Sequence, residues 1–244
     1  MSESLPLSIP DLLSDESKRC AEFPVVRDSI FLGHAAVCPL PTKVLNACTH
    51  YLEQAALNDQ ESVFSGVQVH SIRRVAAEII QCSLEEVALI GPTSNALSMI
   101  AEGLPYGKGD EILVYFDDYP SNVYPWVALE EKGVTIRYIQ TRSLGEIGIR
   151  ELEQSINKQT RLVALASCHY LSGYRIDIDR IGEYLHTLGI KFCLDAIQTV
   201  GAFPTTMQHV DFMAADSHKW MLGPCGAGIL FVKKDLQDFL KPRV

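Results

Sequence analysis

The chain has 244 residues, a formal net charge of −9, 47% hydrophobic residues and 21% charged residues, a composition typical of a globular protein with a substantial core. The negative charge argues against nucleic acid and anionic membrane surfaces as partners, and no apolar run is long enough for a transmembrane helix. Seven cysteines are scattered without a CxxC pair, so we expect reduced thiols in a cytoplasmic protein.

Residues 1–40 are predicted to form an irregular N-terminal arm with one short strand in SIFLGHAA (29–36). From there on, apolar runs of strand length alternate with segments of helical periodicity. Strands are expected at 85–91, 111–117, 135–140, 161–168, 191–197, 212–217 and 227–233. Helices are expected at 43–57, 69–82, 94–104, 122–131, 147–157 and 178–188. In the second helix, one face carries Ile72, Val75, Ile79 and Ile80.

Most of the expected strands are apolar on both faces, which is typical of a parallel sheet covered by helices on both sides. The last two strands are joined by about ten residues without a helix, which is short for a parallel crossover, so we expect the last strand to run antiparallel. The predicted fold is therefore α/β, with a seven-stranded, mostly parallel sheet sandwiched by helices in a single domain over residues 41–244.

Polar or aromatic residues follow five of these strands, and in such sheets ligands lie beyond the carboxyl ends of the strands. After the first strand, GPTSNA opens a helix with Thr93 and Ser94. Free backbone N–H groups and two hydroxyls at a helix start suit a phosphate, although the same residues also fit an ordinary N-cap. The turn lacks the GxGxxG and GxxxxGK[ST] patterns, which disfavours a dinucleotide or nucleoside triphosphate site.

Asp195 and Lys219 are the candidates for cofactor chemistry. A carboxylate at the end of a central strand needs a partner, and Asp195 suits a protonated ring nitrogen as well as a helix cap. A partly desolvated lysine attacks aldehydes as a neutral amine, whereas an ordinary lysine lies on the surface. A phosphate cradle, Asp195 and Lys219 in one chain together indicate a phosphorylated pyridine aldehyde.

Three further residues are placed near this site by the predicted topology. Tyr119 follows the second strand and suits stacking on such a ring, or a place in the core. His169 follows the fourth strand and suits a hydrogen bond to the ring or the substrate, or a structural role. Gln198 lies one helical turn beyond Asp195, where its amide would point to the same side.

Residues from about 30 to 235 resemble the class V aminotransferase and cysteine desulfurase family, pyridoxal-phosphate enzymes of fold type I. The stretches that carry the resemblance are LDAIQTVGAFP, DFMAADSHKWMLGPCGAGIL, DDYPSNVYPW and VALIGPTSNALSMIAEGL. The resemblance implies pyridoxal 5′-phosphate as cofactor and an amino acid as substrate. It further implies that Lys219 holds the cofactor as a Schiff base, that Asp195 pairs with the pyridinium nitrogen, and that Tyr119 stacks on the ring.

The same resemblance assigns the remaining contacts. Gln198 would reach the ring hydroxyl, and His169 fills a position often held by asparagine or glutamine. His34 matches a substrate-side loop of the family. The phosphate would be bound by Thr93, Ser94 and His218, with Asp216 or Ser217 beside them. No metal site is expected.

Family members continue past the lysine into a small C-terminal domain, which we expect to be absent here because the sequence stops at LKPRV. The expected function is a pyridoxal-phosphate-dependent enzyme, a transaminase or a cysteine desulfurase or lyase, acting as a homodimer by resemblance. The alternative is a cofactor-binding domain without independent catalysis that serves as a binding or assembly partner. A Rossmann-like nucleotide binder is a further alternative, disfavoured by the missing glycine fingerprint.

Overall fold

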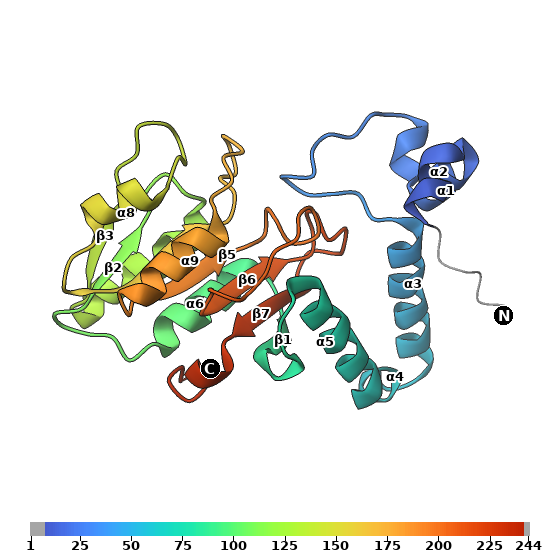
Figure 1. The fold of residues 1–244 in the computed structure, drawn as a ribbon. Helices are drawn as coiled ribbons and strands as arrows, with labels where there is room; N and C mark the ends of the chain where they lie inside the picture. The colour runs from blue at the N-terminus through green and yellow to red at the C-terminus, as the bar shows by residue number, and fades with distance from the viewer. Residues whose placement is uncertain (1–7, 242–244) are drawn as a thin grey trace.

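The computed structural model describes residues 8–241 and is built on one seven-stranded sheet (Figure 1). The strands are β1 Val87–Ile90, β2 Glu111–Val114, β3 Thr135–Tyr138, β4 Thr160–Ala166, β5 Lys191–Asp195, β6 Phe212–Asp216 and β7 Gly228–Val232. Their order in the sheet is β1-β7-β6-β5-β4-β2-β3. Only β7 runs antiparallel to its neighbours β1 and β6, and the other pairs are parallel. All seven predicted strands and the antiparallel last strand are confirmed.

Helices cover both faces of this sheet, as predicted. The helices after the N-terminal region are α3 Thr42–Leu57, α4 Gln60–Val63, α5 Gly66–Ile80, α6 Thr93–Gly103, α7 Tyr124–Val127, α8 Ile149–Ser155 and α9 Ile178–Thr187. One core layer lies between the sheet and α6 and α7, and the other between the sheet and α5, α8 and α9. Within residues 8–241, no helix is both long and apolar enough to span a membrane.

The alternation of side chains along β5 decides where its last residue points. Successive residues of a strand face opposite sides of the sheet. Cys193 packs in the core layer under α6, and Leu194 packs in the layer under α9. Asp195 is therefore on the α6 side, at the carboxyl end of a central parallel strand.

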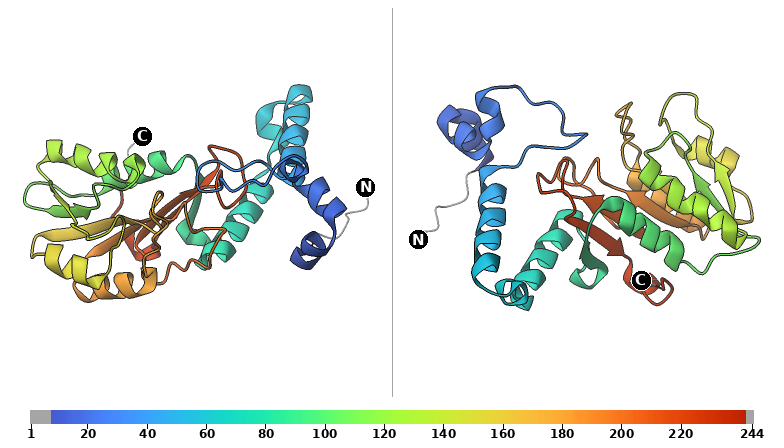
Figure 2. Two further views of the ribbon diagram at one scale, coloured as in Figure 1. Left: turned by 90° about the horizontal axis from the view of Figure 1, so that it is seen from above. Right: turned by 180° about the vertical axis from the view of Figure 1, so that it is seen from behind.

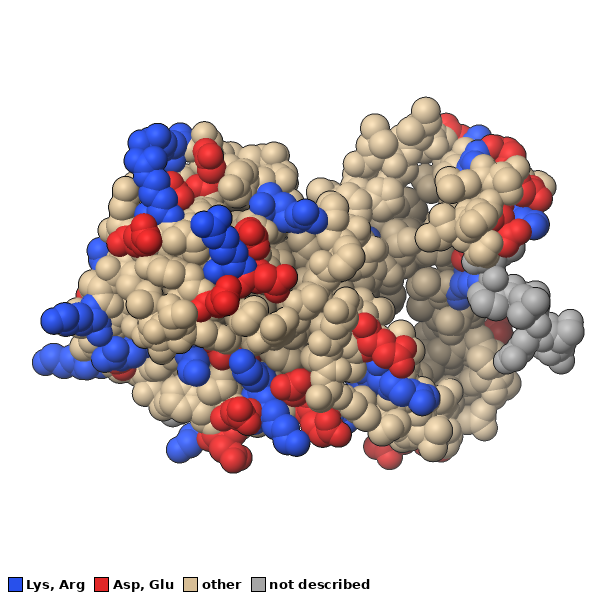
Figure 3. Space-filling view, viewed as in Figure 1, with Lys and Arg blue, Asp and Glu red and all other residues tan. Residues whose placement is uncertain are grey.

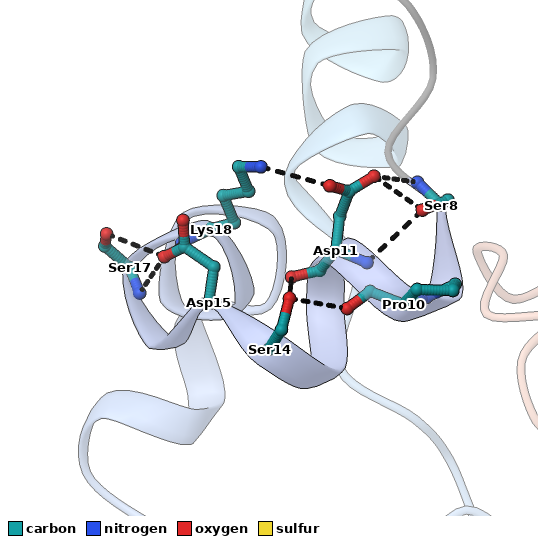
Figure 4. Close-up of polar contacts among 7 residues, drawn as sticks. All are labelled: Ser8, Pro10, Asp11, Ser14, Asp15, Ser17 and Lys18. Carbon is teal, nitrogen blue, oxygen red and sulfur yellow. Dashed lines mark hydrogen bonds and ion pairs between the residues drawn. The ribbon is translucent and has the colours of Figure 1, made fainter.

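The N-terminal region is more helical than predicted. It forms α1 (Ile9–Ser14) and α2 (Glu16–Glu22), which lie with α3 to one side of the sheet (Figures 1 and 2). The capping residues were present in the sequence: Ser8 and Asp11 form a reciprocal capping box, and Asp15 accepts the first N–H groups of α2 (Figure 4). These local caps satisfy helix termini without a packed core. Residues 1–7 of the predicted arm and 242–244 of the predicted domain lie outside the described residues.

Two predicted elements differ from the structure. The strand expected at 29–36 is wrong, because this segment forms a turn and extended chain and pairs with no strand. The helix expected at 122–131 is broken into a 3-10 turn, the short α7 and a second 3-10 turn at Ala128–Lys132. Pro120 and Pro125 remove backbone donors there, so a continuous helix is unfavourable.

The predicted apolar face of α5 is only partly used. Helix α5 starts at Gly66, three residues before the predicted start, because Ser65 and Gln68 form a capping box. Ile80 packs against the sheet, but Ile72, Val75 and Ile79 remain exposed. The space-filling view shows charged side chains mainly over the sheet-bearing part and the N-terminal helices, with a largely uncharged surface between them (Figure 3).

Candidate active site

A cavity of about 570 Å³ opens at the carboxyl ends of β1, β2, β4, β5 and β6. The loop before α3 closes one side of it. The residues that line the cavity are Ala35, Ala36, Val37, Pro92, Thr93, Ser94, Tyr119, Ser121, Tyr170, Leu171, Asp195, Ile197, His218 and Lys219. Six of the residues predicted for the site therefore meet in one cavity: Thr93, Ser94, Tyr119, Asp195, His218 and Lys219.

Lys219 is a buried lysine, with only 8% of its surface exposed. It follows β6 by three residues and faces the ring of Tyr119, whose centroid is 5.5 Å from the Lys219 Nζ. Burial lowers the pKa of Lys219, and the nearby Asp195 carboxylate opposes this effect. The amine is thereby biased toward its neutral, nucleophilic form.

Asp195 is 3% exposed and lies in the same cavity. Its Oδ1 accepts a hydrogen bond from the backbone N–H of Ile197 at 3.1 Å, and no other hydrogen bond to the carboxylate occurs within residues 8–241. Burial raises the pKa of Asp195 to about 7, and the neighbouring Asp118 adds to the rise, while Lys219 lowers it. A carboxyl group in this position is suited to a cationic ligand, which would restore its charged form.

The start of α6 forms the opposite side of the cavity. Pro92 is the N-cap of this helix and provides no side-chain cap. The first bonded N–H groups belong to Asn95 and Ala96, which both donate to the carbonyl of Pro92. The N–H groups of Thr93 and Ser94 have no hydrogen-bond partner among the described residues, as expected at a helix start. This end of α6 is therefore able to bind an anion.

The hydroxyl groups of Thr93 and Ser217 both form hydrogen bonds with β6 or the loop that follows it. The hydroxyl of Thr93 accepts a hydrogen bond from the backbone N–H of Asp216 at 2.8 Å, which anchors the helix start to the sheet. Ser217 donates its hydroxyl to the carbonyl of Pro224 at 3.0 Å. Ser217 does not line the cavity and faces a separate apolar groove. The structure therefore does not bring Ser217 into the cavity lining with Thr93 and Ser94.

His218 lines the cavity with a ring nitrogen that is incompletely satisfied. Its Nδ1 is 3.0 Å from the Oδ2 of Asp216, but the geometry is not that of a hydrogen bond, and this buried nitrogen has no hydrogen-bond partner. Asp216 itself accepts the N–H groups of Ser217 and Gly226. The buried Nδ1 therefore faces the Asp216 carboxylate, and other atoms of His218 border the cavity.

Gln198 and His34 support the cavity without lining it. The Nε2 of Gln198 donates to the carbonyl of Ala35 at 2.9 Å, and its Oε1 accepts from the indole N–H of Trp220 at 2.8 Å. The ring of His34 stacks on Trp220 with centroids 5.4 Å apart. The backbone N–H of Cys38 donates to the carbonyl of His218 at 2.8 Å. These contacts hold the loop before α3 against the lysine-bearing segment.

His169 is buried outside the cavity. Its Nε2 is 2.9 Å from the carbonyl of Asp117, and its Nδ1 accepts the N–H of Ser172 at 3.2 Å. The next residue, Tyr170, lines the cavity instead. The sequence analysis missed Tyr170 although it directly follows a predicted site residue, because two adjacent polar aromatic residues give no sign of which one faces inward.

Comparison with known proteins identifies the family. The sequence model described as Aminotransferase class-V matches residues 30–244. The chain belongs to this family. A probable cysteine desulfurase of Methanothermobacter thermautotrophicus is 30% identical over 228 residues, which cover 91% of this chain and 57% of the relative.

Two solved structures have a fold similar to that of this chain. The apo cysteine desulfurase of Thermococcus onnurineus NA1 has a TM-score of 0.84 at 23% identity. The alignment covers 94% of this chain and 60% of that one. A mutant of C-DES, described with glycine covalently linked to its PLP cofactor, has a TM-score of 0.83 at 21% identity, with 92% of this chain and 62% of that one covered. This chain thus spans about 60% of the length of these three proteins.

Proposed function

We propose that residues 41–244 bind pyridoxal 5′-phosphate and form the cofactor-binding part of an enzyme that acts on an amino acid. The observation that carries this proposal is the pair Asp195 and Lys219, both buried in one cavity and both with pKa values displaced toward the neutral form. Membership in the class-V family and the PLP cofactor named for the structurally similar C-DES support it.

The residues present fit this cofactor at each of its chemical groups. Asp195 has a buried carboxyl with a single hydrogen bond, which suits a protonated ring nitrogen. The free N–H groups of Thr93 and Ser94, with His218 beside them in the cavity lining, suit a phosphate. The ring of Tyr119 suits stacking on a flat heterocycle. The amine of Lys219 suits a covalent bond to the aldehyde carbon.

When bound, the cofactor supplies a cationic ring that withdraws electrons from the α-carbon of an amino acid. Asp195 would hold the ring nitrogen in its protonated form through a charge-assisted hydrogen bond. Lys219 would serve as the general base for the α-proton, and the burial that lowers its pKa favours the neutral amine that this role needs. Tyr119 covers the site on the side that faces Lys219.

The names of the relatives favour cysteine as the substrate and removal of its sulfur as the reaction. No cysteine of this chain lines the cavity, so a transamination or another lyase outcome fits the described residues equally well.

We also propose a homodimer. An apolar groove of about 1020 Å³ between α5 and the β1–β7 edge offers a surface for a second copy. Location in the cytoplasm stays a prediction.

The test of the cofactor assignment is a visible absorption spectrum of the purified protein with added pyridoxal phosphate, before and after borohydride reduction. We expect a yellow band in the wild type that reduction converts into a stable covalent adduct. Lys219→Ala should lose the adduct. Lys233→Ala should keep it, because Lys233 follows the antiparallel β7 and lies at the opposite end of the strands. Absence of a band in a folded wild-type protein would refute the proposal, whereas a band without turnover of any amino acid would favour the cofactor-binding partner.

A further inference from the structure

Tyr119 is not held in place by packing in the hydrophobic core. Its side chain is 48% exposed and it lies on a loop, yet its ring forms a wall of the cavity opposite Lys219. A half-exposed ring on a loop samples several rotamers unless neighbours restrict it. Two neighbours restrict it, Asp118 and Tyr170, and neither was assigned a contact with the cofactor above.

Asp118 holds the backbone on which Tyr119 sits. This carboxylate is 6% exposed and accepts three hydrogen bonds: from the N–H of Tyr119 at 2.7 Å, from the Nδ2 of Asn122 at 3.0 Å and from the N–H of Ala166 at 3.0 Å. The last of these crosses to the end of β4, the strand that pairs with β5 at Asp195. The loop carrying the ring is therefore tied to the strand beside the buried acid.

Tyr170 holds the ring itself. Its ring meets Tyr119 edge to face, with centroids 5.3 Å apart and planes at 80°. On its other side, Tyr170 contacts the ring of His169 at 5.0 Å. His169 is locked by the carbonyl of Asp117 and the N–H of Ser172. A line of three rings thus runs from a fixed buried histidine to the exposed tyrosine.

We propose that Asp118 and Tyr170 are positioning residues that fix the ring of Tyr119 in the wall facing Lys219. The backbone contact sets the distance of this wall from the strand ends, and the edge-to-face contact sets its tilt. The proposal deepens the cofactor assignment by naming what orients the stacking ring. It also has a direct consequence in the protein without cofactor, because a displaced Tyr119 exposes the amine of Lys219.

The first experiment measures how fast an amine-acylating reagent labels Lys219 in the cofactor-free protein, read by peptide mass spectrometry. Aromatic pairs contribute enough that losing one should raise the labelling rate in Tyr170→Ala by about three- to tenfold. Tyr170→Phe retains the ring edge and should match the wild type within about twofold. Tyr174→Ala is the matched control, because Tyr174 lies in the same turn but does not line the cavity.

Asp118→Asn tests the backbone contact in the same assay. An amide offers one acceptor oxygen in place of two, so at least one of the three bonds is lost and labelling of Lys219 should again rise. Thermal unfolding of each variant checks that the fold is retained. Equal labelling rates in the wild type, Tyr170→Ala and folded Asp118→Asn would overturn the proposal, whatever the cofactor does.

A second readout is the visible circular dichroism of bound pyridoxal phosphate, which depends on the orientation of the ring relative to its neighbours. We expect Tyr170→Ala to bind the cofactor about three- to tenfold more weakly and with a smaller signal, and Tyr170→Phe to behave as wild type. An unchanged signal and affinity in Tyr170→Ala would count against the proposal. If the wild type shows no band at all, the cofactor assignment fails, while the labelling rates still decide whether Tyr170 positions Tyr119.

Discussion

Asp195 and Lys219 carry opposite formal charges and line one cavity, yet no ion pair joins them among residues 8–241. Each is buried, so each pays for ionisation without a close partner. Burial raises the pKa of Asp195 to about 7 and lowers that of Lys219. Such opposed shifts are typical of a site that binds a charged ligand. Without the ligand, the two buried ionisable groups lower the free energy of unfolding.

Asp195→Asn is expected to stabilise the cofactor-free protein at high pH. The folded pKa of Asp195 lies above its unfolded value of 3.8, so the folded state binds more protons between pH 4 and pH 7 and stability falls as the pH rises through this window. Removal of the charge should therefore raise the free energy of unfolding by about 2 to 4 kcal/mol at pH 8. The gain should vanish near pH 4. Urea unfolding at several pH values measures it.

Asp211 provides the matched control for this experiment. It is as buried as Asp195, but it accepts the N–H of Phe192 at 2.8 Å and lies 3.1 Å from the Nε2 of His186. Because these partners satisfy its charge, Asp211→Asn should lower the free energy of unfolding. A loss of stability in Asp195→Asn at pH 8 would contradict the description of Asp195 as an unpaired acid.

Side-chain direction sets the limit of what the sequence predicts at this scale. Lys219, Asp195 and Thr93 were predictable because they follow strands whose ends meet at one edge. His169 and Tyr170 are adjacent in a turn, and the fixed carbonyl of Asp117, distant in sequence, selects which of them points inward. Gln198 forms hydrogen bonds with Ala35 and Trp220 and does not line the cavity, and no local sequence pattern predicts these two contacts.

At the scale of elements, apolar strands were easier to predict than loops and short helices. The five inner strands are buried on both faces over most of their length, and their apolar composition reflects this burial. The edge strands β1 and β3 are partly exposed. The segment 29–36 has the composition of a strand but pairs with none. Its end instead lies over the carboxyl ends of the strands, where Ala35 and Ala36 line the cavity. Periodicity also missed the prolines that break the helix around α7.

Ser65→Ala is expected to weaken α5 from its first turn. Ser65 accepts the N–H of Gln68 and receives the Gln68 side chain on its own N–H at 2.8 Å. Loss of the hydroxyl should cost about 1 kcal/mol in the free energy of unfolding, measured by urea denaturation. Ser65→Asp retains an N-cap acceptor and should stay within about 0.5 kcal/mol of the wild type. Equal stability of Ser65→Ala and the wild type would show that packing alone sets the start of α5.

At the scale of the whole molecule, the uncovered face of α5 is the main apolar surface associated with a cavity. Ile72, Val75 and Ile79 line the groove with Leu89 of β1 and Phe203. Monomeric proteins seldom expose contiguous apolar surface of this kind. The helical periodicity placed these residues on one face of the helix, and the exposure of this face in a single copy supports the homodimer proposed above.

Val75→Asp is expected to shift the protein from dimer to monomer. A charge at the centre of an apolar contact is costly to bury without a partner, so the dissociation constant should rise by at least about tenfold. Sedimentation velocity over a range of concentrations measures this. Leu144→Asp serves as control, because Leu144 is equally apolar and exposed but does not line the groove. A wild type that is monomeric at all concentrations would refute the homodimer.

The pairing of β1 with β7 has a consequence for how the polypeptide acquires its shape during synthesis. Val87 lies opposite Phe231, so one edge of the sheet joins residues 144 positions apart. Contacts of such long range are entropically expensive to close and slow to form. While the ribosome is still making the intervening stretch, β1 and α5 have no sheet to pack on. Their apolar residues then stay exposed until β7 has been made, which is the period in which an incompletely folded chain is most prone to aggregate.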